Sequence, residues 1–594
     1  KNKKLDKKKT NYIFSPIIRF ITIVLYVICG FFLCLLAKKY IRERFFDDDD
    51  DDEESEKNLI KPKKKNRFRL NVPKGPMSFP LVGNMIQLGS RPYLKMLDWM
   101  NFYGPIYKIY LGSELVVVLN GTDTIREALI DYSEEFAGRP HLYMIHATLK
   151  GKGVISSPYN DEFHEHKLFL LKNFNRLSRR RSSLEVNCLQ TIRETLDSYR
   201  ELSSTDSLTY TNFEFKNSLS QITSQNILSM TFGMRMYDKS TFSKLMDLVS
   251  ENFRGTTVAA AFNFLPITRL FRRYILKNVI KASEFLNNLV SEKIQESKEN
   301  GEFETSPDIN IIECYLNELM NNVGFFDDSS TFFLNKLLSS TNSAAFDSES
   351  KALTERRKSS ITCESGSGSS RRKSTFRSNF NSFSFDHLSS IVQDLFIAGT
   401  ETVSNTLNWA IIYAVYFQEH QKRIADEIEQ IIGRERLPTE SDRSKMPFVE
   451  AFIYETMRYS CTGPVLVPRS TTRDVVFKGY QIPCGTFIMV NIWSSMRDRA
   501  HWIEPDKFEP KRFLDPNGLF KCKNPAMLPF SAGKRACPGE KLALQQLFLI
   551  FTSLIQKFHI TFASDSDYKR KNILDGTFGV GLVPPNVSLK LIMR

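Results

Sequence analysis

A stretch of fifteen residues near the C-terminus, PFSAGKRACPGEKLA, constrains the possible fold more than any other part of the chain. It places one cysteine, Cys537, between a glycine-rich bend and an expected helix start. Gly533 and Gly539 allow the backbone to wrap closely around a partner, because glycine adopts conformations closed to other residues. The apolar run from Leu542 to Ile550 is typical of the body of the helix that follows.

The surroundings of Cys537 predict a reactive thiol. Pro538 and Glu540 suit the first turn of the following helix, whose N-terminal dipole favours an anion. Lys534 and Arg535 stand just before the cysteine. A thiol beside a helix N-terminus and two cations is biased towards the thiolate, so Cys537 is predicted to be either a nucleophile or a metal ligand.

The other cysteines suggest no competing use. The chain has nine, none forms a CxxC pair, and their spacing indicates neither a zinc cluster nor a disulfide framework. Reduced thiols in a cytosolic setting are the simplest interpretation. With 594 residues, 42% of them apolar, the chain is long enough for a large core or two domains.

The net charge of +14 raises the hypothesis of a nucleic-acid-binding protein. Residues 1–70 hold 18 Lys and Arg against 11 Asp and Glu, and residues 351–377 hold eight against two. These two segments carry +13 of the total, so the rest of the chain is almost neutral. A folded nucleic-acid-binding face would concentrate the basic residues, so we expect no nucleic-acid partner.

The N-terminal part predicts a membrane anchor. After a basic segment (1–19), residues 20–37 run for eighteen residues without a charge, which is just enough to span a bilayer. Basic residues and no small-residue cleavage site follow, which favours an uncleaved transmembrane helix over a signal peptide, with a buried core helix as the alternative. Basic residues flank both sides, so charge alone does not set the orientation. A charged linker (38–71) leads into the folded region (72–594).

One segment interrupts the folded region. Residues 327–381 are rich in Ser, Thr, Asn and Arg, a composition that cannot offset its own ordering entropy, so they are expected to be a disordered insertion between two helical patterns. The insertion contains RRKSS and RRKST, which resemble substrates of basophilic kinases. The basic residues could equally keep a Ser-rich loop soluble or contact an anionic membrane, since short motifs recur by chance.

The longest periodic segment, Phe385–Phe417, predicts a helix that carries AGTET in its middle. A glycine inside a helix costs roughly 1 kcal/mol relative to alanine, so Gly399 needs a reason. A group could approach the backbone there, the Thr402 hydroxyl could bond to the preceding turn, or the glycine could serve a close helix crossing. Glu401 and Thr402 set an acid and an alcohol side by side.

A second helix, beginning near Pro447, carries YETMR. Glu455 and Arg458 lie three residues apart on one face among apolar neighbours, which predicts a partly buried pair that needs further hydrogen bonds. Arg512, in FEPKRF, is a candidate third member. An ordinary surface ion pair is the alternative.

These motifs together resemble the cytochromes P-450, the haem-thiolate monooxygenases. The cysteine-ligand loop of that family is matched at five positions: Phe530, Gly533, Arg535, Cys537 and Gly539. AGTET, the ExxR pair and FEPKRF follow the family's order at similar spacing, and the resemblance covers residues 72–594 apart from the insertion. KGKGVISSPYNDEF, EEFAGRP and LFIAGTETVSNTLNWAI are similar to the microsomal family-two branch.

The resemblance implies a mainly α fold with small β-sheets, shaped as a triangular helical prism. Haem b, iron protoporphyrin IX, would lie between the long central helix and the cysteine loop. Cys537 would be the thiolate ligand of the iron, with Phe530 shielding the sulfur and the backbone N–H groups after Cys537 tuning it. Gly533 and Gly539 would shape the loop around the cofactor.

The resemblance also assigns the charged residues. Arg535 and Arg469, in VPRST, would bind the haem propionates, and Thr402 with Glu401 would relay protons during oxygen activation. Glu455, Arg458 and Arg512 would form a structural triad behind the haem.

Two positions depart from the family. Phe163 and Lys167 stand where a Trp and an Arg usually face the haem edge. Lys167 can pair with a propionate as a point charge without the guanidinium fork, so we expect somewhat weaker haem retention. Val403 replaces a frequent hydroxyl residue but leaves Thr402 in place.

The implied reaction inserts one oxygen atom of dioxygen into an apolar substrate, such as a fatty acid, a steroid or a xenobiotic. Electrons would come from NADPH through a flavoprotein, NADPH-cytochrome reductase, with cytochrome b5 as a further candidate partner. The catalytic domain would face the cytosol from the endoplasmic reticulum membrane, held by membrane lipid and a single span. The substrate-lining segments would be His141–Lys150, Asn263–Ile267, Phe396–Thr402, Thr462–Val467 and Gly576–Gly581.

Two other functions stay open on the sequence. A haem-thiolate isomerase or dehydratase would need no reductase, but such enzymes tend to lose the threonine that Thr402 represents. A haem-binding gas or redox sensor would not need the Glu401–Thr402 pair.

Overall fold

The computed structural model describes residues 71–142, 146, 151–179, 184–201, 209–213, 215–233, 263–265, 277–299, 310–323, 383–563, 574–579 and 581–594. The predicted anchor (20–37) and the whole of the predicted insertion (327–381) lie outside these residues. Across the described ranges, no helix combines the length and the hydropathy that crossing a membrane requires.

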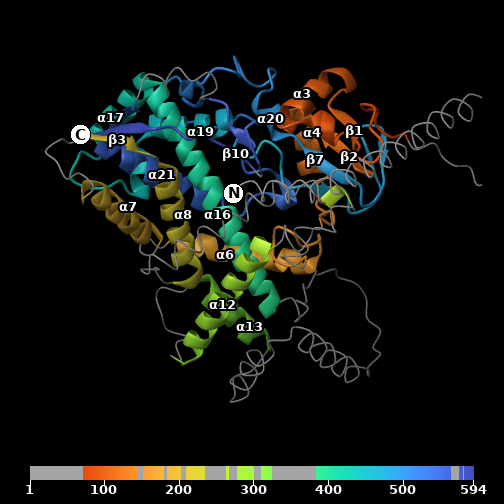
Figure 1. Ribbon diagram of the computed structural model, residues 1–594, viewed down its shortest axis with the longest axis horizontal. Helices are drawn as coiled ribbons and strands as arrows, with labels where there is room; N and C mark the ends of the chain where they lie inside the picture. The colour runs from red at the N-terminus through yellow and green to blue at the C-terminus, as the bar shows by residue number, and fades with distance from the viewer. Residues whose placement is uncertain are drawn as a thin grey trace, which may run out of the picture.

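A single long helix, α16 (Phe385–Tyr416), runs through the middle of the molecule (Figure 1). Ser384 caps its start by accepting a hydrogen bond from the His387 backbone N–H at 3.3 Å. Of its 32 residues, 25 are buried, so other elements cover it on almost every side. The predicted helix at 385–417 is thereby confirmed, and it is the axis on which the fold is built.

The helices around α16 divide the core into two main clusters. One joins α16 to α7, α8, α17, α19 and α21, and the other joins it to α6, α8, α12 and α13. Their bounds are α6 Asp161–Arg179, α7 Leu184–Glu201, α8 Phe215–Phe232, α12 Lys277–Glu299, α13 Ile311–Val323, α17 Gln418–Ile431, α18 Glu440–Arg443, α19 Pro447–Ser460 and α21 Glu540–Lys557. Pro447 opens α19 and Glu540 opens α21, as the sequence predicts.

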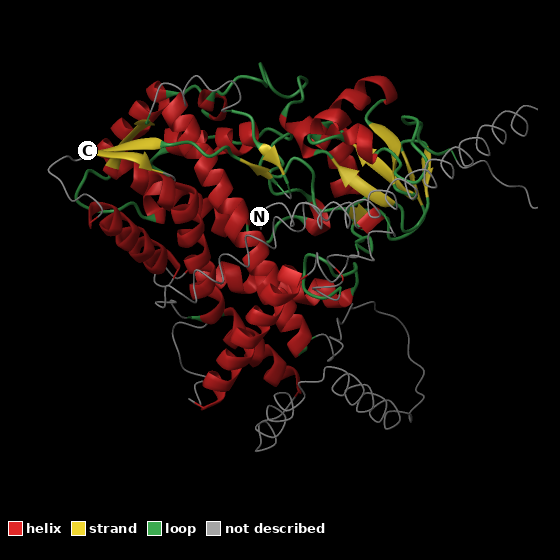
Figure 2. Ribbon diagram, in the orientation of Figure 1, coloured by secondary structure: helices red, strands yellow, loops and turns green. Residues whose placement is uncertain are grey.

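The largest described sheet lies apart from the main helical mass (Figures 1 and 2) and has the strand order β1-β2-β7-β4. Its strands are β1 Ile106–Leu111, β2 Glu114–Leu119, β7 Phe487–Val490 and β4 Arg469–Ser470. β1 and β2 form an antiparallel hairpin, and β2 runs parallel to β7 with Val116 opposite Phe487. The short helices of this region are α2 Met85–Leu88, α3 Pro92–Tyr103, α4 Thr122–Arg126, the π-helix η1 Glu127–Asp131 and α20 Ile492–Met496.

A three-stranded sheet, ordered β3-β11-β8, lies by the C-terminus (Figure 2). Its strands are β3 Thr209–Phe213, β11 Leu589–Met593 and β8 Phe558–Phe562. The two remaining pairs are β5 Val475–Phe477 with β6 Tyr480–Ile482, and β9 Thr577–Phe578 with β10 Leu582–Val583. The predicted mainly α fold with small sheets is confirmed.

Candidate active site

The cysteine loop is closed by its own backbone. The Cys537 N–H donates to the Phe530 carbonyl at 2.9 Å, and the 3-10 turn η4 (Gly533–Arg535) lies between them. Gly533 has φ +71°, and a Cβ built there would lie 1.7 Å from the carbonyl oxygen of Leu129 in η1. Only glycine fits this backbone contact, so Gly533 holds the loop against η1.

The environment of the Cys537 thiol differs from the one that the sequence suggests. Cys537 is accessible to solvent, yet burial by the surrounding chain raises its pKa, against a smaller lowering by the Gly539 backbone N–H. This differs from the predicted bias towards thiolate. The reason is that the adjacent cations turn away: Lys534 pairs with Glu134 at 3.5 Å, and Arg535 points into the neighbouring loop.

The middle of α16 has one exposed face. Ala398 and Thr402, one turn apart, are its only exposed residues, although the helix crosses the interior. The Thr402 hydroxyl donates to the Ala398 carbonyl at 2.6 Å, while Glu401 next to it is buried. Exposure at this depth indicates that Thr402 borders an internal space.

Gly399 serves a close helix crossing. A Cβ at this position would lie 2.4 Å from Cδ1 of Ile227 in α8. The helix-crossing explanation is therefore confirmed, and the hydrogen bond from Thr402 to the preceding turn is present as well.

Four cations gather beside the cysteine loop. Arg535 donates to three carbonyl oxygens, those of Ala137 at 2.8 Å, Val154 at 3.1 Å and Ser157 at 2.7 Å. Its guanidinium lies 3.7 Å from the ring centre of Phe163 in α6, a cation–π contact. Phe163 thus supports Arg535 directly.

The other three cations are Arg469, Arg139 and Lys167. Arg469 donates to the Ser531 hydroxyl at 2.8 Å, and Arg139 donates from Nε to the Ile155 carbonyl at 2.7 Å. Lys167, in α6, donates to the Lys534 carbonyl at 2.6 Å.

Burial lowers the pKa of each of these cations, and repulsion from neighbouring cations adds to the shift of Arg535, Arg469 and Lys167. The values fall to about 8 for Arg535, about 9 for Arg469, about 10 for Arg139 and about 8 for Lys167, with burial the largest cause each time. None of the four forms an ion pair with a carboxylate of the described residues, and the buried Nε of Arg469 has no hydrogen-bond partner there. Such a cluster fits an anionic ligand, and the two propionates of haem meet that requirement.

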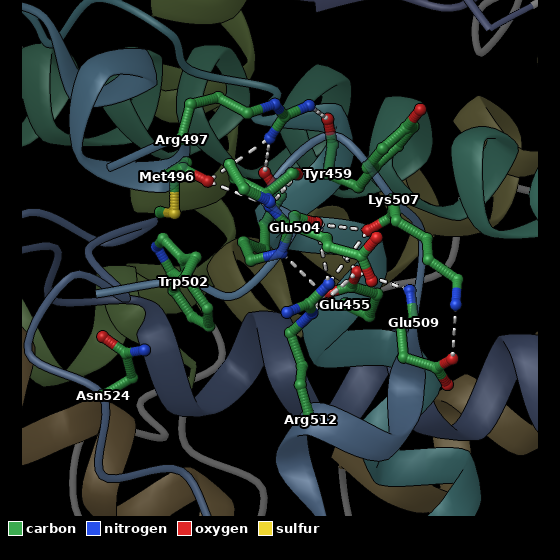
Figure 3. A network of polar contacts seen from close by, with 12 residues as sticks. Glu455, Tyr459, Met496, Arg497, Trp502, Glu504, Lys507, Glu509, Arg512 and Asn524 are labelled. Atoms are coloured by element: carbon green, nitrogen blue, oxygen red, sulfur yellow. Dashed lines mark hydrogen bonds and ion pairs between the residues drawn. The ribbon is translucent and has the colours of Figure 1, made fainter. Parts of the chain in front are cut away.

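A buried network joins the predicted triad. Arg458 and Glu455 are fully buried and make two hydrogen bonds of 2.7 Å, and Arg458 also donates to the carbonyls of Met496 and Pro505. Arg512 reaches the same carboxylate at 3.1 Å, and the Glu509 N–H donates to it at 2.7 Å (Figure 3). The structure thus brings the three residues together, and each charge has several partners.

The segments expected to line a substrate site meet where they are described. Leu142, Phe264 and Val465 each pack against the core cluster of the four-stranded sheet. The hydroxyl of Thr462 lies 3.0 Å from that of Thr406 in α16, and its carbonyl accepts from the Leu582 N–H at 2.7 Å. Most of His141–Lys150 lies outside the described residues.

Sequence reasoning missed Arg139 and Asp394. Arg139 stands in EEFAGRP, which contributed only to the resemblance, so the motif itself was an available signal. Asp394 interrupts the apolar face of α16, and a carboxylate in such a position is a signal of a buried partner.

Comparison with known proteins agrees with this geometry. The family model for cytochrome P450 matches residues 73–591. Cytochrome P450 2U1 of Mus musculus is 29% identical over 555 residues, covering 88% of this chain and 91% of the relative. Cytochrome P450 2C5 of Oryctolagus cuniculus is 30% identical over 535 residues, covering 89% and 96%. Cytochrome P450 2C8 of Homo sapiens is 30% identical, covering 88% and 94%. With its cysteine loop, its central helix and this extent of similarity, the chain belongs to the cytochrome P450 family, as a monooxygenase of the family-two type.

Proposed function

We propose that this haem monooxygenase oxidises apolar substrates at the endoplasmic reticulum membrane with electrons from NADPH delivered by a flavoprotein reductase. The observation that carries the proposal is the exposed Cys537 beside four cations that form no ion pair with a described carboxylate. Bound at this site, haem would supply a thiolate-ligated iron that activates dioxygen. Cys537 would ligate the iron, and Arg535, Arg469, Arg139 and Lys167 would hold the propionates.

Thr402 and Glu401 are the proposed proton-handling pair. The Thr402 hydroxyl donates its hydrogen bond to the Ala398 carbonyl, which leaves the hydroxyl oxygen able to accept a hydrogen bond from the exposed side. Glu401, buried on the adjacent position, would resupply the proton through the hydroxyl. The pair would thereby let protons reach the site while the helix keeps bulk water out.

An apolar substrate agrees with the described lining. Leu142, Phe264 and Val465 present hydrocarbon surface, and Thr406 and Thr462 satisfy each other with a mutual hydrogen bond. No charged side chain belongs to this set, so a charged substrate would lose hydration there without compensation.

Membrane association is supported by a group of exposed apolar residues. Met77, Phe79, Leu81 and Ile86 are 84%, 48%, 55% and 69% exposed, and all lie just after the charged linker. Apolar exposure of this kind suits contact with lipid. The family-two relatives support the same location.

The test is spectroscopic and catalytic. The reduced protein with carbon monoxide is expected to give the red-shifted Soret band of thiolate ligation, and Cys537→Ser is expected to lose it. A wild-type spectrum typical of histidine ligation would refute the site. NADPH consumption and oxygenated product with a reconstituted reductase distinguish a monooxygenase from an isomerase, which needs no NADPH, and from a sensor, which forms no product.

A further inference from the structure

Asp394 is a buried carboxylate in α16 that binds a loop rather than a cation. Its Oδ2 accepts hydrogen bonds from the backbone N–H of Val154 at 2.6 Å and of Ile155 at 2.9 Å. Its side chain is 3% exposed, and its other oxygen, Oδ1, has no hydrogen-bond partner in the described chain. Burial raises the pKa of Asp394 to about 7, and the two N–H bonds and the charge of Arg139 oppose that rise, so the charged form depends on these contacts.

Positive charge lies on the carbonyl side of the same short stretch of backbone. The peptide that links Val154 to Ile155 donates its N–H to Asp394 and accepts at its carbonyl from Arg535 at 3.1 Å. The next carbonyl, that of Ile155, accepts from Arg139 at 2.7 Å. Two guanidinium groups and one carboxylate are therefore joined through the backbone of residues 154–155.

This arrangement polarises the peptide group between Val154 and Ile155, which has the Asp394 carboxylate at its N–H and the Arg535 guanidinium at its carbonyl. An anion at the N–H and a cation at the carbonyl each strengthen the hydrogen bond made at the other end, and the effect grows in a low-dielectric interior. Asp394 consequently stabilises the charge of Arg535 through this peptide group, and the attraction of its carboxylate also raises the pKa of Arg139.

We infer that Asp394 is a positioning residue for haem. Through the backbone of Val154 and Ile155, it holds in place the two arginines that would bind the propionates and keeps them protonated. This inference rests on the proposed haem binding. It assigns to the start of the central helix a role in retaining the cofactor, separate from the role of the Thr402 region.

The close approach of the loop depends on Gly153. Its φ is +79°, and a Cβ there would lie 2.4 Å from Oδ2 of Asp394. A larger residue at position 153 would have to push the loop away from the carboxylate. Gly151 also has a positive φ, +73°, but a Cβ there would meet only the ring edge of His146 at 3.1 Å. The two glycines therefore form a matched pair for experiment.

Glu427 in α17 provides a matched control for Asp394. This carboxylate likewise accepts two backbone N–H bonds, from Phe448 at 3.1 Å and Val449 at 2.8 Å, and burial raises its pKa. Its partners begin α19 and make no hydrogen bond to the four cations of the cluster. Glu427→Gln thus measures the effect of neutralising a buried, backbone-bound carboxylate away from the cluster.

The experiment measures the rate at which haem passes from each full-length holoprotein to excess apomyoglobin, alongside the unfolding midpoint. Asp394→Asn keeps an oxygen for both N–H bonds but removes the charge. We expect it to speed haem release by about tenfold or more, while Glu427→Gln lowers the midpoint but changes release by no more than about twofold. Equal release from Asp394→Asn and wild type, or equal acceleration by Glu427→Gln, would overturn the inference.

Gly153→Ala provides a second test, which remains usable if Asp394→Asn takes up no haem. It keeps the carboxylate and separates the loop from it, so it is expected to release haem faster than Gly151→Ala. Similar rates for the two alanine variants would also overturn the inference. A wild-type protein that binds no thiolate-ligated haem would instead contradict the proposed function, so the two failures are distinguishable.

Discussion

At the scale of single residues, the geometry of the site depends on which group each charged side chain contacts. Lys534 and Arg535 flank the cysteine in sequence, yet both turn away from the thiol and bind Glu134 and backbone carbonyls. The positions of Lys534 and Arg535 next to the cysteine in the sequence therefore predicted a contact with the thiol that the structure does not show. Adjacent side chains on the turn η4 diverge, and their partners come from segments hundreds of residues away.

The Thr402 hydroxyl provides the first prediction. Thr402→Ala removes the group proposed to pass protons but leaves the cysteine loop and the cation cluster intact. We expect haem content and substrate binding to persist, while product formed per NADPH falls and peroxide rises. Thr402→Ser, which can keep the bond to the Ala398 carbonyl, is expected to retain most of the coupling. A product-to-NADPH ratio that is unchanged in Thr402→Ala would place the proton route elsewhere.

The Glu455–Arg458 pair provides the second prediction. Both side chains are fully buried, so Glu455→Gln leaves the Arg458 charge without its anion. We expect a loss of roughly 3–5 kcal/mol in the free energy of unfolding. The control is Glu429→Gln, which breaks a pair with Arg434 that is 55% and 62% exposed. Surface pairs contribute about 0–1 kcal/mol, so equal losses in denaturant titrations would refute the buried triad's structural importance.

At the scale of elements, α16 links the two main core clusters and also borders the site. The crossing with α8 at Gly399 sets how closely the two helices pack. Any displacement there would move Thr402, three residues further along the same helix. The packing of the core and the position of the proton-handling hydroxyl are therefore coupled.

Gly399→Ala tests that crossing. The added methyl group meets Cδ1 of Ile227, and overpacking of about 1–3 kcal/mol outweighs the roughly 1 kcal/mol gained in helix propensity. We expect a lower unfolding midpoint, and partial recovery in Gly399→Ala/Ile227→Val, because valine lacks the contacting atom. An absence of recovery would show that Ile227 is not the limiting contact.

A stacked histidine pair links α6 to α16. The His166 and His387 rings lie 4.4 Å apart at 15°, and His166 bonds the Tyr315 hydroxyl of α13. Burial lowers the pKa of His166 from 6.5 to about 4 and of His387 to about 3, and repulsion from His166 adds to the shift of His387.

Acid should therefore weaken this helix junction. Below pH 6.5 the two histidines bind protons in the unfolded chain but not in the folded protein. The free energy of unfolding therefore decreases as the pH falls towards about 4. The Asp386 carboxylate raises the pKa of His387 and offsets part of this loss, while Lys152, which is paired with Asp386, lowers that pKa; the Glu162 carboxylate lies 4.0 Å from His387. A His166→Met/His387→Ser variant is expected to lose less stability over this range in unfolding titrations. A parallel pH profile for the variant and the wild type would contradict the assignment.

At the scale of the whole molecule, local patterns predicted the elements and not the connections between them. The bounds of α16, α19 and α21 follow from a serine cap, a first-turn proline and apolar runs, all of which act within a few residues. The backbone link between Asp394 and Arg535 could not be predicted in this way, because it depends on how residues 151–157 fold between segments distant in sequence.

The two helices that bracket residues 324–382 are already joined. The Tyr315 hydroxyl of α13 accepts from the Ser384 N–H at 3.0 Å and donates to its carbonyl at 3.2 Å. Deleting residues 328–378 and adding a short linker is therefore expected to preserve the carbon monoxide spectrum and most of the turnover. Loss of bound haem in that variant would show that the segment contributes to the haem domain.

The parallel pairing of β2 with β7 has a consequence for synthesis on the ribosome. Val116 cannot pair with Phe487 until most of the chain has left the exit tunnel. The pairing of β3 with β11 forms later still, because β11 lies at the C-terminus. Pairings between such distant segments form slowly and leave strand edges open in the meantime. The nascent chain must therefore be protected from aggregation until it is complete, and it can acquire its cofactor only after translation of the cysteine loop.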